Sequence, residues 1–435
     1  MNLQAFLSIL SIFAISSLLF GSVAFATNDP DNITLNQHCT VTINGENVGD
    51  NAIQSAIDAS ASGSTICLDA AVYHENIVIT KPLTLEGVGH AIQNGESHNL
   101  NDIAILEPTN LVSTTSDIDN SHNLSAPIIL VQGGSAGLTG VTIQNLEVNG
   151  NIIGSKLTDC GLDASNPEPV GIMFQSASGT IDDVVSLDVE SNQALFGCQD
   201  DAGLGIFVQT ATGLNSNVLI KDSSITNYQK NGITCNDAGT SCDVSNDVVA
   251  GIGQTTLTAQ NGVQIAYGAT GTIENSQISG DSYSAASDTE DYFTSLYQAT
   301  GILLFDAPGV VISNNAVSLS DIGMWVGGDN TLSANNDASN NVFLKNYGYG
   351  VVFDSFNGTS TNNFFQNNPV GLLVTDYSSN ANVTSINDQF MNNVVNNEAL
   401  GVPGSTWFAD LVVETSGHPI HVPHHQHNIH HFPTR

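Results

Sequence analysis

Two short patterns of apolar and polar residues recur along most of the chain. The first reads apolar–x–Asn/Asp–x–x–apolar. Its clearest copies lie at residues 143–148, 220–225, 273–278 and 312–317, with weaker ones centred on Asn340, Asn362 and Asn387. The second is a glycine followed by an apolar-rich triplet. Its copies lie at residues 171–174, 205–208, 232–235, 262–265, 301–304, 323–326, 350–353 and 371–374. Because the two patterns interleave, each repeat holds at least two short strands separated by Asn- and Gly-rich turns.

The spacing of these repeats predicts the fold class. Short strands that recur once per 21–30 residues, with almost no helical periodicity, are typical of an all-β, single-stranded parallel β-helix. Each strand of such a solenoid pairs with its equivalent one coil away, about 4.8 Å along the axis, so equivalent side chains stack. The repeated Asn is therefore interpreted as a ladder of stacked amides that bond to one another and to turn backbone. The alternative is a row of asparagines that binds sugars.

The ends of the predicted solenoid carry candidate caps. Residues 50–61 form the one good helical stretch, because Ile53, Ala56 and Ile57 share a face and Asp50 is in position for an N-cap. We interpret this stretch as the N-terminal cap helix. Strands are expected at residues 64–68, 75–79 and 83–85, and the last strand or cap at residues 407–413.

Two segments, 94–125 and 281–299, break the period and are expected to be long loops. Long loops on a solenoid often form the walls of a binding groove. The alternative for either loop is an insertion that the fold merely tolerates.

The first 26 residues predict export. The segment from Ala5 to Phe20 is apolar, and residues 24–26 offer small side chains for cleavage, as in a secretory signal peptide. An uncleaved membrane anchor is the alternative, but no later segment is apolar enough to predict a second span. The expected organisation is a signal at 1–26, a β-helix domain at 27–413 and a flexible tail at 414–435. The expected location is secreted, cell-surface or periplasmic.

Six cysteines in an exported chain suggest three disulfides. Cys235 and Cys242 bracket a short turn and are paired first. Proximity along the chain then suggests Cys39 with Cys67 and Cys160 with Cys198. Six cysteines allow fifteen arrangements, and a metal site is the weaker alternative because no CxxC spacing exists.

The charge balance excludes some functions. The chain has 42 Asp and Glu against 6 Lys and Arg, a formal charge of −36, and its one arginine is the last residue, Arg435. A nucleic-acid binder needs Lys and Arg to neutralise phosphates, so this class is excluded. The acids are interpreted as a solvated surface, with cation binding as the alternative. A polyanionic substrate would be repelled unless divalent cations bridged it.

Several segments resemble a known family. Residues 51–58, 63–68, 73–79 and 83–87 look like the N-terminal signature of the pectin-lyase-like right-handed β-helix proteins. Residues 227–233 and 260–264 resemble exported β-helix repeat proteins whose activity is mostly undefined. The resemblance implies a right-handed parallel β-helix over about residues 50–400. It does not imply one chemistry, because this fold hosts lyases, hydrolases, esterases, epimerases, adhesins and copper-processing periplasmic proteins.

Two enzyme classes of this family are disfavoured. Arginine-dependent pectate lyases use a basic residue as catalytic base, and the repeats contain no arginine. Lys230 precedes a predicted strand, where a solvated lysine is ordinary. Pectin methylesterases share the style of Tyr73-His74-Glu75-Asn76, and Gln199-Asp200 resembles their catalytic segment, but that family also needs an arginine.

Hydrolysis needs neighbouring acids on adjacent coils, one of which acts as general acid. The densest acidic region of the repeats supplies the candidates. These catalytic candidates are Asp182, Asp183, Asp200 and Asp201. The same carboxylates are candidate Ca²⁺ ligands, and the plain alternative is a set of surface acids.

The C-terminal tail is the sharpest local feature. Its candidate metal ligands are His418, His421, His424, His425, His427, His430 and His431. Neutral imidazoles suit Cu²⁺, Zn²⁺ and Ni²⁺. Prolines at 419, 423 and 433 favour an extended, flexible tail, and the alternative is a low-complexity tail with incidental affinity.

The function that these features favour is an exported or cell-surface protein that binds glycans or other surface polymers, with divalent-metal binding by its acids and tail. The first alternative is a carbohydrate-active enzyme, a polysaccharide hydrolase or lyase, working in a groove beside residues 281–299. The second alternative is copper-type metal handling through the tail. The sequence leaves the oligomeric state open.

Overall fold

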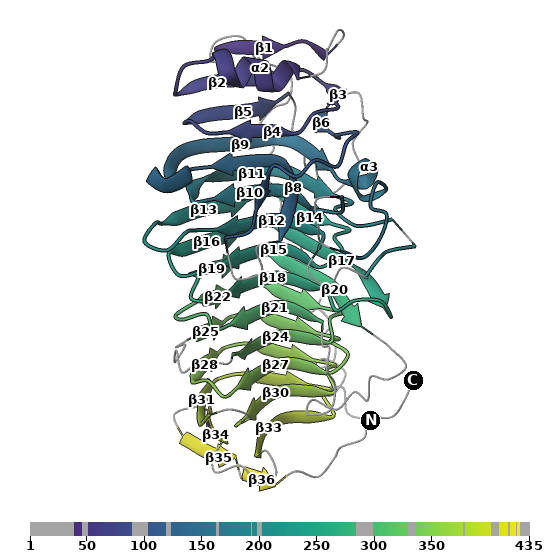
Figure 1. Cartoon of the computed structure of the whole chain (residues 1–435). Coiled ribbons are helices and arrows are strands. Elements are labelled where there is room, and N and C mark those ends of the chain that lie inside the picture. The colour runs from purple at the N-terminus through teal and green to yellow at the C-terminus, as the bar shows by residue number, and fades with distance from the viewer. Residues whose placement is uncertain are drawn as a thin grey trace, which may run out of the picture.

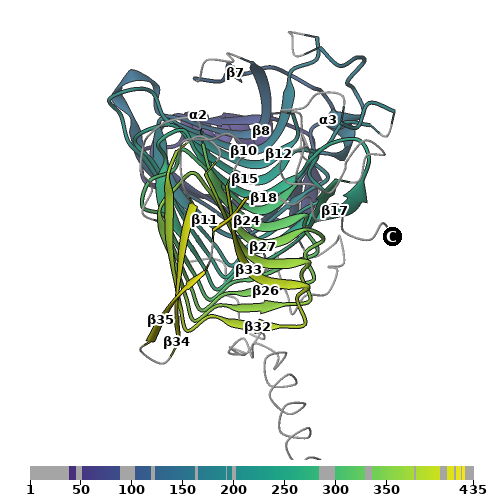
Figure 2. The same ribbon diagram turned by 90° about the horizontal axis from the view of Figure 1, so that it is seen from below.

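The computed structural model describes residues 39–45, 51–88, 103–118, 123–161, 165–192, 194–197, 202–283, 299–328, 336–376, 379–401, 409–415, 418–422 and 424–426. In these residues short parallel strands follow one another along a single axis (Figure 1). Figure 2 looks along that axis and shows equivalent strands of successive coils one behind the other. The arrangement is a parallel β-helix, as the repeat spacing predicts.

One sheet, here sheet 2, collects one strand from each coil and contains the glycine-led pattern. Its strands are β4 (Ile77–Ile79), β7 (Thr115–Ser116), β8 (Leu124–Gln132), β10 (Glu168–Gln175), β12 (Leu204–Gln209), β15 (Asn231–Asn236), β18 (Asn261–Ala266), β21 (Thr300–Phe305), β24 (Ile322–Gly327), β27 (Tyr349–Asp354), β30 (Val370–Thr375), β33 (Val395–Gly401) and β36 (His424–Gln426). Only β7, which pairs with β8, is antiparallel within this set.

The other sheet, sheet 1, takes two consecutive segments of each coil. Its strands are β1 (Val41–Ile43), β2 (Ser64–Leu68), β3 (Ala71–Tyr73), β5 (Leu83–Gly87), β6 (Ala104–Leu106), β9 (Leu138–Asn149), β11 (Ala177–Leu187), β13 (Ser216–Lys221), β14 (Ser224–Thr226), β16 (Thr240–Ser245), β17 (Val248–Thr255), β19 (Thr270–Glu274), β20 (Gln277–Tyr283), β22 (Val311–Ser313), β23 (Ala316–Ser318), β25 (Asn336–Ser339), β26 (Val342–Leu344), β28 (Gly358–Thr361), β29 (Phe364–Gln366), β31 (Ala381–Ile386), β32 (Gln389–Met391), β34 (Ala409–Thr415) and β35 (His418–Val422). The helices are α2 (Ala52–Ala59), α3 (Asn151–Gly154) and the short 3₁₀ turn Gly134–Ala136.

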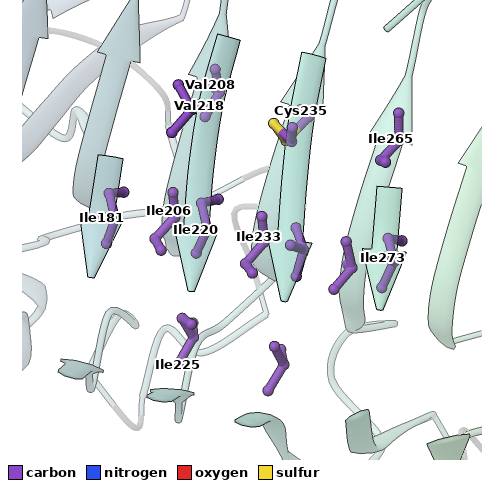
Figure 3. Packing of buried hydrophobic residues seen from close by; sticks show 14 of the residues in the cluster. Ile181, Ile206, Val208, Val218, Ile220, Ile225, Ile233, Cys235, Ile265 and Ile273 are labelled. Carbon is purple, nitrogen blue, oxygen red and sulfur yellow. A yellow bond between two sulfur atoms is a disulfide. The ribbon is translucent and has the colours of Figure 1, made fainter. Parts of the chain in front are cut away.

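The register between coils stacks the apolar residues of the repeats inside the solenoid. In sheet 2, Ile206 lies opposite Ile233, which lies opposite Val263. In sheet 1, Ile220 lies opposite Val244. Figure 3 shows these columns facing one another across one continuous, fully buried core. Since side chains alternate between the two faces of a strand, every second residue of sheet 2 must point outward.

The repeated Asn of the first pattern lies at the corner between the two segments of sheet 1. These corner residues all have positive φ, between 51° and 60°. They are Asn145, Asp183, Asp222, Asn246, Asn275, Asn314, Asn340, Asn362 and Asn387. Asn and Asp tolerate this left-handed conformation better than other residues with a Cβ. The need for a residue that tolerates positive φ at each corner, and not amide stacking, therefore explains why Asn or Asp recurs at this position of the pattern.

The amide ladder exists, but it is built by the residue after each corner. The expectation that the pattern's own Asn would stack is wrong, because those corner side chains point away from the core. Instead Asn315 N donates to Asn341 Oδ1 at 2.9 Å, and Asn341 N donates to Asn363 Oδ1 at 2.8 Å. Ser223, Asp247 and Ser276 continue the ladder in earlier coils. Each buried backbone N–H at the corner is thus satisfied by the next coil.

The N-terminal helix caps the solenoid as expected, with Ile53 and Ile57 buried against the first coil. Its own N-terminus was expected to be capped by Asp50, which lies outside the described residues. The structure shows a different cap: the Glu75 carboxylate accepts from Ile53 N at 2.8 Å and from Gln54 N at 3.0 Å. Asn51, at the N-cap position, makes no side-chain cap bond.

Disulfides are present between Cys39 and Cys67 and between Cys235 and Cys242, two of the pairs suggested by the sequence. The second joins β15 to β16 inside the core (Figure 3). Cys160 is also disulfide-bonded, and its expected partner Cys198 lies outside the described residues.

Parts of the predicted tail form strands. β34 crosses the expected boundary at residue 413, β35 pairs antiparallel with β34, and β36 adds to β33. The signal segment 1–26 and residues 427–435 lie outside the described residues. None of the helices in the described ranges has the length and apolar character that a bilayer crossing requires.

Two adjacent asparagines separate the roles of ladder and corner. Asn341→Ala should lower the free energy of unfolding by about 2–3 kcal/mol, because it leaves the buried Asn315 N–H without its acceptor. Asn340→Gly should lower it by less than about 1 kcal/mol, because glycine adopts positive φ freely. Urea denaturation of both variants measures the difference. Equal losses would contradict the assignment of the ladder to the second position.

Asp247 should make stability depend on pH. Burial raises its pKa from 3.8 to about 8, although backbone N–H groups of Ser223 and Ser245 favour the charged form. The folded chain therefore binds this proton more tightly than the unfolded chain, so stability falls as pH rises from 4 to 8. Asp247→Asn should flatten that slope, whereas Asp243→Asn, on the outer face of the same coil, should not. Urea midpoints across this pH range test it, and an unchanged slope in Asp247→Asn would refute it.

Candidate functional site

A cleft of about 700 Å³ lies on the outer face of sheet 2. Its lining residues come from β10, β12, β15 and β18, from the segment before β8, and from the turns that precede or follow the strands. They are Asp117, Ile118, Asn123, Glu168, Leu204, Phe207, Thr210, Thr212, Gly213, Lys230, Asn231, Thr234, Asn236, Asp237, Ala238, Gln264 and Tyr267. The cleft therefore spans several neighbouring coils.

The floor of the cleft is a network of amide and hydroxyl side chains. Asn231 Nδ2 donates to Thr234 Oγ1 and to Gln264 Oε1, both at 3.0 Å. Gln264 Nε2 in turn donates to Asn236 Oδ1 at 3.1 Å. Asn261 continues the network by donating to Asn231 Oδ1 at 2.9 Å. Because these residues lie on adjacent rigid strands and fix one another, their positions are set before any ligand arrives.

One wall of the cleft is formed by the first insertion. A row of stacked glutamines on sheet 2 anchors it: Gln175 Nε2 donates to Ser116 O at 2.8 Å, and Ile118 N donates to Gln209 Oε1 at 2.5 Å. Asp117 Oδ1 accepts from Ser125 Oγ at 2.7 Å. Asp117, Ile118 and Asn123 are the residues of the insertion that line the cleft, so this part of it forms a groove wall, one of the two alternatives left open by the sequence. The expectation that all of 94–125 is a loop is wrong, because β6 of the same segment pairs with β3 and β9 in sheet 1.

Tyr267 adds an aromatic side chain to the lining. It follows β18, is 52% exposed, and contacts Phe305 edge-to-face with 5.5 Å between ring centroids. The ring centroids of Phe305 and Trp325, which lies on the next coil, are 6.1 Å apart. Phe305 and Trp325 are not among the residues that line the cleft.

The cleft also holds charged residues. Asp117 and Glu168 are buried, and Asp237 and Lys230 are partly exposed. The hydroxyl of Thr210, only 2% exposed, has no hydrogen-bond partner among the described residues. Only the tertiary structure brings these residues together, since the insertion and the strand ends are far apart in sequence.

The acids that the sequence singled out lie elsewhere. Asp182 is on sheet 1, where Lys221 Nζ lies 2.7 Å from its Oδ2, and Asp183 is a corner residue. Neither lines the cleft. Asp200 and Asp201 lie outside the described residues, so a catalytic role for these acids stays a prediction.

Buried acids occur near the sheet edges without forming an obvious catalytic pair. Burial, with help from the neighbouring Asp188, raises the pKa of Glu190 from 4.5 to about 7. Burial also raises the pKa of Asp281 well above its ordinary value, and its Oδ1 accepts from the Tyr228 hydroxyl at 2.6 Å. This pair is fully enclosed, so it serves the packing of the coils.

The two described ends of the second insertion, Tyr283 and Ala299, are both hydrogen-bonded to Asp321. Asp321 Oδ2 accepts from Tyr283 N at 2.9 Å and from Ala299 N at 3.1 Å. Residues 284–298 lie outside the described residues, so a groove beside them stays a prediction.

Metal binding is likewise untested. Within the described ranges, no group of three or more His, Cys, Asp or Glu side chains is arranged to hold a metal ion. The histidines of the tail belong to β35, β36 or residues outside the described ranges, and their proposed ligation stays a prediction, as does Ca²⁺ binding by the acids.

A comparison with known protein families supports the fold. Residues 205–390 match the family model described as right handed beta helix region, so with the strand topology the chain is a right-handed parallel β-helix. The sequence has no significant match among curated proteins.

Solved structures with a similar fold are distant in sequence. An alginate lyase from Paenibacillus sp. str. FPU-7 is 13% identical, with a TM-score of 0.41 over 82% of this chain and 100% of that one. The periplasmic alginate epimerase AlgG is 12% identical, with a TM-score of 0.46 over 83% and 70%. The A-module of the Azotobacter vinelandii mannuronan C-5 epimerase AlgE6 is 15% identical, with a TM-score of 0.45 over 88% and 92%. These similarities concern the fold alone.

The glutamine row should hold the wall of the cleft in place. Gln209→Leu removes the acceptor of Ile118 N–H, so amide exchange at residues 116–118 should speed up about tenfold. Gln264→Leu, which perturbs only the floor, should leave that exchange unchanged. Hydrogen–deuterium exchange measures both, and equal rates at residues 116–118 in Gln209→Leu and the unmodified protein would contradict the anchoring.

Proposed function

We propose that this protein is an extracytoplasmic glycan-binding protein whose ligand lies in the cleft on sheet 2. The observation that carries the proposal is the composition of that cleft, an amide and hydroxyl floor beside an exposed aromatic ring. Disulfides support a location outside the cytoplasm, because reducing compartments do not maintain them.

The floor matches the hydrogen-bonding needs of sugars. Each sugar hydroxyl is both donor and acceptor, and Asn and Gln amides offer both functions in fixed geometry. Asn231, Asn236 and Gln264 present such groups on two successive strands. Tyr267 supplies an amphipathic ring against which the apolar face of a pyranose can pack.

The architecture favours a polymer over a small molecule. Equivalent positions recur about every 4.8 Å along the axis, and the cleft draws its lining from the successive strands β12, β15 and β18. A glycan running along the axis would meet similar surfaces at successive residues. This supports a polysaccharide or cell-surface polymer as partner.

Catalysis is the rival function. The cleft contains the carboxyl groups of Asp117 and Glu168, and a polysaccharide hydrolase or lyase would need acids of this kind beside the scissile bond. The two functions differ in whether the bound polymer is cleaved. Metal binding through the His-rich tail is a separate component of the proposal and does not involve the cleft.

The test is a screen of the mature chain, residues 27–435, against immobilised polysaccharides, reading both retention and released sugar ends. We expect retention without products. For a retained polymer, Gln264→Ala and Tyr267→Ala should each weaken binding about tenfold, because they remove a floor amide and the stacking surface. Thr384→Ala, on the outer face of sheet 1, is the matched control.

The outcomes separate the hypotheses. Released reducing or unsaturated ends would establish the enzyme and overturn a pure binding role. Retention that the two cleft variants do not weaken would place the site elsewhere. No retention on any polymer would refute glycan binding.

A further inference from the structure

We propose that the cleft on sheet 2 selects glycans whose sugars carry neutral acetamido groups, in preference to unsubstituted, amino or uronic-acid glycans. This inference rests on the proposed glycan-binding function and adds the chemical class of the ligand. It is carried by the direction of the hydrogen bonds in the floor of the cleft.

The side chains of the floor form one chain of hydrogen bonds that runs in a single direction. Thr300 Oγ1 donates to Asn261 Oδ1 at 2.6 Å, and Asn261 Nδ2 donates to Asn231 Oδ1 at 2.9 Å. Asn231 Nδ2 donates to Gln264 Oε1 at 3.0 Å, and Gln264 Nε2 donates to Asn236 Oδ1 at 3.1 Å. Every carbonyl oxygen of this chain therefore already accepts a hydrogen bond from the protein.

The chain of hydrogen bonds ends on the amide nitrogen of Asn236. This residue lines the cleft and is 6% exposed, and its Nδ2 has no hydrogen-bond partner among the described residues. Nor is this nitrogen one of the enclosed side-chain atoms that lack a partner, so it reaches the open space of the cleft. The floor consequently offers a ligand the N–H donors of an amide that its buried neighbours hold in place.

These donors need an acceptor on the ligand. Linked hydrogen bonds polarise one another, so the amide at the end of such a chain is a stronger donor than an isolated amide. The carbonyl oxygen of an acetamido group has two lone pairs and no hydrogen of its own. A protonated amino group has three donors and no acceptor, so its N–H bonds would face those of Asn236.

Negatively charged acceptors are disfavoured by the charge of the protein. Carboxylate and sulfate groups also accept hydrogen bonds from N–H donors. However, the chain has a formal charge of −36, and Lys230 is the one lysine or arginine among the residues that line the cleft. A surface of this sign repels polyanions. The acceptor that fits the cleft is therefore neutral.

The methyl group of an acetamido substituent also finds a partner. Ala238 follows Asn236 by two residues, lines the cleft and is exposed. A ligand methyl that packs on this side chain leaves water, which favours binding. Unsubstituted and amino sugars have no such methyl group.

The experiment compares oligomers that differ in one substituent of each sugar. The mature chain, 27–435, is titrated by calorimetry at about pH 6, where amines are protonated. The probes are β-1,4-linked hexamers of N-acetylglucosamine, of glucose, of glucosamine and of a uronic acid, the last with and without Ca²⁺. The N-acetylated hexamer should bind about tenfold more tightly than each of the others. Because the N-acetylated and glucose hexamers are both neutral, the preference between them should persist when salt is raised to about 0.5 M.

Two variants with the same change in charge locate the effect. Asn236→Asp replaces the open amide nitrogen with an oxygen of similar size, while the other oxygen still accepts from Gln264. It should weaken binding of the N-acetylated hexamer about tenfold, weaken binding of the glucose hexamer less than about threefold, and strengthen binding of the amine hexamer. Retained binding of the glucose hexamer shows that the variant is folded. Asn217→Asp, exposed on β13 of sheet 1, is the matched control and should leave all affinities unchanged.

The failures are distinguishable. If the glucose, amine or uronic-acid hexamer binds as tightly as the N-acetylated one, acetamido selection is wrong while glycan binding stands. Equal weakening of the N-acetylated hexamer by Asn236→Asp and Asn217→Asp would overturn selection by the Asn236 amide. If none of the hexamers binds, this inference fails, and the screen of immobilised polysaccharides decides the proposed function separately.

Discussion

The corner between the two segments of sheet 1 is the constraint on which the rest of this structure depends. A residue with positive φ turns the chain there, at a cost of about 1–2 kcal/mol for most residues with a Cβ. The repeats meet this demand with Asn or Asp, and the following residue satisfies the buried backbone through the ladder from Ser223 to Asn363. Since the same turn recurs in coil after coil, the strands stay in register and the apolar columns stack into one core.

The cleft is a consequence of that regularity combined with one departure from it. Regular strands present Asn231, Thr234 and Gln264 outward at fixed spacing, without any role in the core. The first insertion then leaves the coil and docks on the glutamine row to form a wall. Because the outer face of sheet 2 does not decide packing, its residues are available for binding, whereas the inner face holds core residues, mostly Ile, Val and Leu together with Phe174, Cys235 and Phe353.

The acidic residues differ in their surroundings, so they do not all have the same effect on the protein. Burial raises the pKa of Asp247 to about 8, so this carboxyl is mostly protonated at neutral pH and the formal charge of −36 overstates the ionised charge. Burial raises the pKa of Asp281 as well. Asp182 is balanced by Lys221, one of the few cations in the repeats. The carboxyl groups of Asp117, Glu168 and Asp237 line the cleft instead.

The sequence was enough to predict the solenoid, its inward residues, the cap helix and two observed disulfides, because each depends on periodicity or on residues close along the chain. It could not show that the ladder lies one residue after the repeated Asn, since both positions share the same spacing. Nor could it show that Glu75 caps the helix, that Lys221 pairs with Asp182, or that Asp117, Thr210 and Tyr267 line one cleft. Those contacts join residues of different coils or of an insertion. Only the register between the coils in the folded structure decides which of these residues meet.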